Sequence, residues 1–143
     1  MDSQRELQKV MYQAEVFKKQ IDGINQQVNM VELTIKSMES TIEALTSLNK
    51  TATKTEVLLP LGSNSFARAK LSDNKNVIVG VSMNVLVEKS IPDAIKLFDK
   101  NIEELNGALA EMQKKSAEIE NQLVNLNNIG EKLIRESQEQ GRI

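Results

Sequence analysis

Two long segments of the chain carry apolar residues at heptad spacing, and this repeat constrains the fold more than any other feature. With Leu7 at heptad position a, apolar residues fill the a and d positions without a break as far as Leu45. A second run begins at Ile95 and is interrupted only at Ser116 and Gly130. A period of about 3.5 residues is typical of left-handed coiled coils. The sequence therefore predicts two long coiled-coil helices.

The two runs have equal length, so they can pair with each other. In an antiparallel pair, position a of one helix faces position d of the other. Folding the chain back on itself sets Leu45 against Ile95 and Ile21 against Ile119, and the numbers of every facing pair add up to 140. The flanking positions are mostly uncharged amides, whereas charges there commonly select a foreign partner helix. This favours an intrachain coiled coil, with an intermolecular one as the alternative.

The segment between the two runs has the texture of β-structure. From Thr55 to Ser90, short apolar stretches alternate with Gly, Asn, Ser and Asp, which indicates four strands in two hairpins. Pro60 lacks an amide donor and is expected at an edge or a bulge. The strands around Leu59 and Val79 are apolar on both faces, and isolated hairpins are marginally stable. We expect sheets of several subunits to stack or to close into a barrel; the alternative is that they cover only the base of the chain's own coiled coil.

These patterns together predict a mostly α fold with a small β region. A long antiparallel intrachain coiled coil carries two β-hairpins at its base, and the hairpins assemble into an oligomeric β-barrel. We divide the chain into an N-terminal coiled-coil helix (residues 1–53), a hairpin region for oligomerisation (54–90) and a C-terminal coiled-coil helix (91–143). The expected oligomerisation residues are Val57, Leu59, Leu61, Phe66, Ile78, Val79, Val81 and Leu86.

Composition narrows the functional classes. The sequence has no Cys and no His, which removes thiolate and imidazole ligands and the commonest general base. We therefore expect no enzyme, no metal and no cofactor. Aromatic residues make up 3% and the net charge is -2, whereas nucleic-acid binders usually show a basic patch with exposed aromatics. No apolar run reaches the roughly 18 residues of a membrane helix and the N-terminus lacks the apolar core of a signal peptide, so we expect a soluble cytoplasmic protein.

Short motifs in the middle segment resemble the alpha class of prefoldin subunits. They are Pro60-Leu61-Gly62, Ser65-Phe66 with Ala69 and Leu71, a valine-rich third strand, and Val87-Glu88-Lys89-Ser90 leading into a helix. The resemblance covers nearly the whole chain, because that family also has the order helix, two hairpins, helix. Alpha-class members often carry Gly in the hairpin turns, whereas this chain has Asn64 and Asn84, and Asn tolerates a positive φ better than most residues.

The resemblance implies a function as well as a fold. It implies a hexamer of two alpha-class and four beta-class subunits, in which strands form a double β-barrel and coiled coils hang as tentacles. Tentacle tips of that family hold unfolded clients and pass them, without ATP, to a group II chaperonin. A variant group, gamma prefoldin, forms homo-filaments, and the residues here favour neither assembly. The partners would be beta-class subunits or further copies of this chain.

Apolar residues outside the a and d positions gather at the expected open end of the coiled coil. The seam, which is the row of a and d residues between the two helices, has smaller side chains there, with Ala14 and Gly130 at core positions. The helices can therefore splay and offer apolar side chains to a client. The expected client-binding residues are Leu7, Val10, Met11, Tyr12, Val16, Ile129, Leu133 and Ile134. The alternative for these residues is ordinary fraying of helix ends. We expect an ATP-independent holdase; the alternative function is a structural coiled coil that forms homo-filaments or acts as a spacer.

Overall fold

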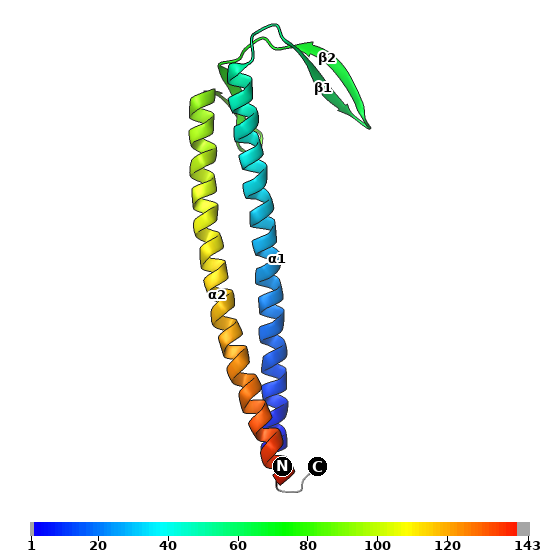
Figure 1. Cartoon of the computed structure of the whole chain (residues 1–143), viewed down its shortest axis with the longest axis vertical. Helices are drawn as coiled ribbons and strands as arrows, with labels where there is room; N and C mark the ends of the chain where they lie inside the picture. The colour runs from blue at the N-terminus through cyan, green and yellow to red at the C-terminus, as the bar shows by residue number, and fades with distance from the viewer. Residues whose placement is uncertain (1, 140–143) are drawn as a thin grey trace. The chain divides into compact units, whose positions relative to one another are not determined.

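A computed structural model of the protein describes residues 2–139 and contains two long helices with two β-hairpins between them. Helix α1 spans Asp2–Lys50 and helix α2 spans Ile91–Glu139. Strands β1 (Glu56–Gly62) and β2 (Ser65–Lys70) pair as the first hairpin, and β3 (Asn76–Ser82) and β4 (Val85–Ser90) pair as the second (Figure 1). The predicted helices and hairpins are confirmed. The barrel and the division into three regions stay predictions, and residues 1 and 140–143 of those regions lie outside the described part.

The chain folds as two compact units, and each unit contains a part of both helices. The first unit comprises Met1–Leu33 and Asn106–Ile143, of which residues 2–33 and 106–139 are described. The second unit comprises Thr34–Leu105, and therefore both hairpins.

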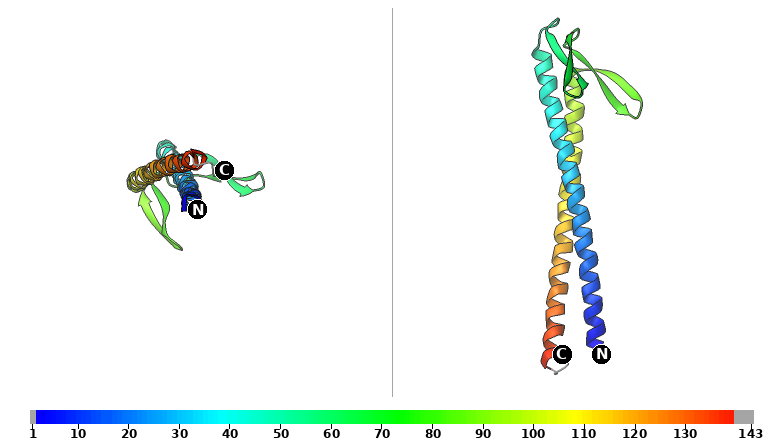
Figure 2. Two further views of the ribbon diagram at one scale, coloured as in Figure 1. Left: turned by 90° about the horizontal axis from the view of Figure 1, so that it is seen from below. Right: turned by 90° about the vertical axis from the view of Figure 1, so that its right-hand side faces the viewer.

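In the first unit the two helix segments lie side by side and run in opposite directions (Figures 1 and 2). Their a and d residues are buried or half-buried throughout, from Leu7 to Val31 and from Leu109 to Leu133. A Cβ built on Gly130 would lie 3.5 Å from Cγ1 of Val10. These two residues form a facing pair in the predicted register, so the intrachain antiparallel pairing is confirmed in this unit.

In the second unit a small core joins the helix ends to the second hairpin. Its buried members are Leu45, Val79, Ile91 and Ala94, and Leu48, Val77, Ile95, Leu97 and Phe98 pack against them. Residues of α1 and α2 meet here as the register requires, because Ile95 packs against the cluster that contains its predicted partner Leu45. Strand β3 contributes Val77 and Val79, which alternate with the exposed Ile78 and thus lie on the same face of the strand.

The start of α2 follows from its capping residues. The hydroxyl of Ser90 accepts a hydrogen bond from the amide of Asp93 at 3.2 Å, as an N-cap residue does. Pro92 lies in the first turn, where its missing amide costs nothing. The amide of Ile91 donates to the carbonyl of Lys75 at 2.8 Å, which ties the helix start to the loop before β3.

The two hairpin turns use Asn where a positive φ is needed. In the first turn Ser63 and Asn64 have φ of 46° and 64°, as a type I′ turn requires. In the second turn Asn84 has φ of 69°. The register of the first hairpin shifts between Pro60 and Gly62, which confirms the expected placement of Pro60 at an irregularity.

Candidate functional site

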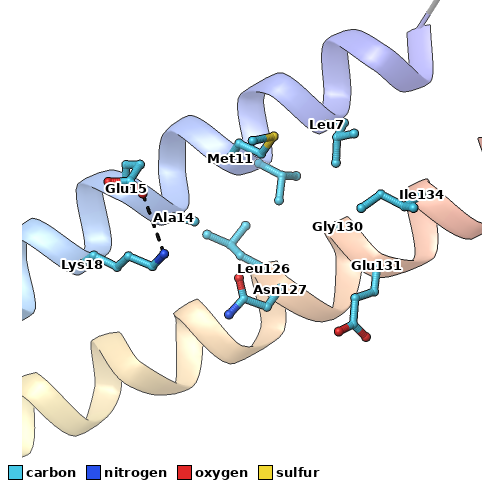
Figure 3. A pocket seen from close by; sticks show the side chains of 11 residues that line it. Leu7, Met11, Ala14, Glu15, Lys18, Leu126, Asn127, Gly130, Glu131 and Ile134 are labelled. Carbon is cyan, nitrogen blue, oxygen red and sulfur yellow. Dashed lines mark ion pairs between the residues drawn. The ribbon is translucent and has the colours of Figure 1, made fainter.

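A groove of about 440 Å³ runs between the two helices in the first unit (Figure 3). It lies between the first turns of α1 and the last turns of α2. The floor consists of seam residues, and the sides consist of the residues that flank the seam. The lining residues are Leu7, Val10, Met11, Ala14, Glu15, Lys18, Leu126, Asn127, Gly130, Glu131 and Ile134.

Small residues at neighbouring levels of the seam create this groove. In the register of the pair, Ala14 faces Leu126 and Gly130 faces Val10. Ala14 and Gly130 are both buried, yet neither has a side chain long enough to fill the seam. The nearest side-chain atom to a Cβ on Gly130 would be at 3.5 Å, which is ordinary van der Waals distance. A Cβ at this position would therefore just contact Val10, and the groove opens beside these small seam residues, which form part of its lining.

The sides of the groove are apolar near the seam. Met11 on α1 is 62% exposed and Ile134 on α2 is 43% exposed. In Figure 3 the side chain of Leu126 extends toward Met11 and Ala14 across the space between the helices. Met adapts its shape to different contacts more readily than branched side chains do. The groove therefore offers a deformable apolar surface to solvent.

The outer edge of the groove is charged. The ammonium group of Lys18 lies 3.7 Å from a carboxylate oxygen of Glu15, one turn away on the same helix. Glu131 and Asn127 stand on the α2 side. Because the first two charges offset each other, the edge carries a net negative charge from Glu131.

The structure brings four of the predicted client-binding residues into the groove: Leu7, Val10, Met11 and Ile134. Leu133 is buried in the seam, Val16 is half-buried, and Tyr12 and Ile129 are exposed outside the groove lining.

Sequence reasoning did not single out the polar edge, Asn127 and Glu131, as part of a site. Helical spacing could have indicated Glu131, because it lies three positions before Ile134 and residues three and four positions apart share one face of a helix.

The hairpins present a second apolar surface. Strand β1 is exposed along its whole length. Val57 and Leu59 pair with Ala69 and Ala67 on one face, while Leu58 pairs with Arg68 on the other. Among the expected oligomerisation residues, those exposed are Val57, Leu59, Leu61, Phe66, Ile78, Val81 and Leu86. Val79 differs, since it is 8% exposed and covered by the helices of its own chain.

Residues 2–139 hold no group of three or more His, Cys, Asp or Glu side chains placed to bind a metal ion. Within the same residues, neither helix contains an apolar stretch long enough to cross a membrane. The pKa of Asp73, in the loop between the hairpins, lies below its ordinary value because the backbone amides of Lys75 and Asn76 donate hydrogen bonds to its carboxylate.

Comparison with known proteins agrees with this architecture. The family model "Prefoldin subunit" matches residues 17–136. Prefoldin subunit alpha of Methanococcus aeolicus is 33% identical over 103 residues, covering 72% of this chain and 69% of the relative. Prefoldin subunit alpha of Pyrococcus horikoshii is 32% identical over 123 residues, covering 80% and 83%.

Among solved structures, a cryo-EM structure of filamentous PFD from Methanocaldococcus jannaschii superposes with a TM-score of 0.75 at 23% identity, covering 82% of this chain and 98% of that one. That likeness supports the fold. The family match and the relatives support more than the fold, because each spans most of this chain. The chain therefore belongs to the prefoldin family, a non-enzymatic family of chaperone subunits, as a member of its alpha class.

Proposed function

We propose that this subunit is an ATP-independent holdase that binds exposed apolar segments of unfolded proteins in the groove between its helix ends. The observation that carries the proposal is the groove itself, with apolar side chains of both helices left open to solvent. We further propose that clients are passed to a group II chaperonin in the cytoplasm, as the family resemblance implies. Tyr12, Val16, Ile129 and Leu133 would add contact area around the groove when the helix ends splay.

The size and chemistry of the groove suit weak and general binding. Burying one large apolar side chain contributes about 1.5–3 kcal/mol. Ordering a flexible segment offsets much of that gain, at roughly 0.5–1.5 kcal/mol for each immobilised side chain. A single groove therefore binds weakly and releases its client readily. Several subunits acting on one chain would raise the affinity through effective concentration.

The exposed hairpins are the proposed assembly surface. Strands that are apolar on both faces are an aggregation hazard unless they are covered. We propose that Val57, Leu59, Leu61, Phe66, Ile78, Val81 and Leu86 are covered by strands of other subunits, in a β-barrel formed with beta-class subunits or with further copies of this chain. The likeness of the fold to a filamentous prefoldin is the reason to test self-assembly as well.

An aggregation assay with matched variants tests the holdase proposal. In the first variant, Met11→Ser and Ile134→Ser remove the two apolar side chains from the sides of the groove. In the control variant, Met30→Ser and Leu33→Ser remove two equally large side chains that are 69% and 66% exposed on α1 and do not line the groove. Light scattering would follow the aggregation of a thermally denatured client enzyme in the presence of each protein.

We expect the groove variant to lose most of its ability to keep the client dispersed and the control variant to retain it. Equal suppression by both variants would contradict binding in the groove. A wild-type protein that never suppresses aggregation would favour the spacer alternative.

Negative-stain electron microscopy tests the assembly. We expect discrete hexamers when a beta-class subunit is present. Fibres formed by this chain alone would instead assign it to homo-filaments.

A further inference from the structure

The charges at the edge of the groove are unequal, and they bear on which segments it binds. Its charged lining residues are Glu15, Lys18 and Glu131. Glu15 and Lys18 form an ion pair with each other at 3.7 Å. Glu131 has no ion-pair partner within residues 2–139; Arg135, one turn further along α2, is not paired with it. One carboxylate beside the apolar floor therefore forms no ion pair.

We infer that the groove selects apolar segments with a Lys or Arg beside the apolar side chains, and that Glu131 reads this positive charge. The inference rests on the proposed function and names the class of client segment at the same site. A cation next to Glu131 gains an attraction, whereas an acidic residue placed there is repelled. The charges of Glu15 and Lys18 offset each other, so this pair adds little preference for basic over acidic segments.

The volume of the groove sets the length of the segment. An engineered protein cavity of about 150 Å³ holds one benzene ring. A groove of about 440 Å³ has room for two or three large apolar side chains. Side chains two positions apart in an extended segment share one face, so the two Leu side chains of a Leu-x-Leu stretch can face the floor. The residues on either side of the stretch then point toward the open side of the groove, where a long basic side chain can reach the charged outer edge. A basic flanking residue of such a stretch would lie near Glu131.

The expected size of the effect follows from the exposure of the site. Exposed ion pairs contribute about 0.2–1 kcal/mol, which corresponds to about a 1.4- to 5-fold change in affinity. Replacing the cation with an anion adds a repulsion of similar size. Salt screens such interactions, with a Debye length of about 10 Å at 0.1 M. The preference should therefore shrink as the ionic strength rises, while apolar binding persists.

Three labelled peptides of equal length test the inference. They share a Leu-x-Leu stretch and differ only in its flanking residues, which are Lys, Ser or Glu. Fluorescence anisotropy would measure their affinity for the full chain in its assembled state. The variants are Glu131→Lys and, as a control with the same change in net charge, Glu136→Lys on α2, which does not line the groove.

We expect the Lys peptide to bind about 1.4- to 5-fold more tightly than the Ser peptide, and the Glu peptide to bind more weakly than both. Glu131→Lys should reverse this order and Glu136→Lys should preserve it. Equal binding of the three peptides, or an order that Glu131→Lys leaves unchanged, would overturn the inference.

The variant with Met11→Ser and Ile134→Ser separates this result from the proposed function. If that variant weakens all three peptides while charge has no effect, the groove binds clients without reading charge, and only the inference fails. If it binds all three peptides as the wild type does, the groove is not the binding site and both proposals fail. A groove filled by a second copy of the chain would also overturn the inference. In that case the two Ser substitutions would weaken the contact between copies, and without peptide the variant would have a lower sedimentation coefficient than the wild type.

Discussion

Replacing Ile91 with Ala gives the most direct measure of the small core that holds the second hairpin against the helix ends. Ile91 is 0% exposed and belongs to a cluster with Leu45, Val79 and Ala94. The substitution removes three carbon atoms, which is worth about 2.4 kcal/mol at about 0.8 kcal/mol for each buried CH₂ group. The cavity left behind adds to this loss, since measured costs of Ile→Ala in protein cores are about 2–5 kcal/mol. We therefore expect the free energy of unfolding to fall by about 2.5–4 kcal/mol.

Ile129→Ala is the matched control, because Ile129 is on the same helix and is 49% exposed. Ala has the higher helix propensity, by up to about 0.7 kcal/mol, so the loss of partial burial should be largely offset. Urea unfolding followed by far-UV circular dichroism at a fixed protomer concentration would compare the variants, since assembly couples stability to concentration. Equal costs for the two substitutions, or a cost below about 1 kcal/mol for Ile91→Ala, would show that packing around Ile91 does not hold the second hairpin against the helix ends.

Three further substitutions test local features of the second unit. Ser90→Ala removes the hydroxyl that accepts from the Asp93 amide and should cost about 1 kcal/mol in urea unfolding, whereas Ser90→Asp should restore most of it. Asn84→Ala keeps the Cβ but removes the short polar side chain that makes a positive φ tolerable, here 69°, and should cost about 1 kcal/mol. Asn84→Gly should cost little, because Gly has no Cβ. The third test concerns Asp73: its folded-state pKa is lowered by the Lys75 and Asn76 amides, so its contribution to stability is present above about pH 4 and is lost as pH falls through the lowered pKa. The stability advantage of the wild type over Asp73→Asn should therefore shrink on acidification below pH 4, and a constant difference would contradict this.

Much of the fold follows from periodicity alone. The heptad repeat fixes which residues face each other, so the register that pairs Val10 with Gly130 could be predicted before any coordinates. Turn chemistry was equally informative, since Asn64 and Asn84 occur where the backbone needs a positive φ. The heptad repeat and the turn residues are both local features of the chain, so they can be recognised in a single sequence.

The difference between the two hairpins could not be predicted in the same way. Both have strands that are apolar on two faces, yet Val79 is buried against the helix ends while β1 is exposed from end to end. The choice depends on the path of the connecting loop, where the carbonyl of Lys75 accepts from the Ile91 amide and the side-chain amide of Asn74 donates to the carbonyl of Thr51. These are tertiary contacts with no sequence period.

The candidate site was predicted in part. Weak seam positions at Ala14 and Gly130 pointed to the correct end of the helix pair. Which apolar residues share one side of that seam depends on the heptad position of each, and only Met11 and Ile134 of the exposed ones line the groove. The charged edge was missed because single charges on coiled-coil surfaces are usually solvated and carry no pattern.

Filling the groove tests most directly the claim that it holds unfolded proteins. Gly130→Leu adds a large side chain to a residue that lines the groove, where the new Cβ would already contact Cγ1 of Val10 at 3.5 Å, and Gly107→Leu places the same side chain on α2 where a Cβ would have nothing within 4 Å. Both changes raise helix propensity by about 1 kcal/mol, so neither should unfold the helix. In the client aggregation assay, we expect Gly130→Leu to lose the suppression of aggregation and Gly107→Leu to keep it. Full suppression by Gly130→Leu, with the helix content of the wild type, would show that unfolded proteins do not bind in this groove.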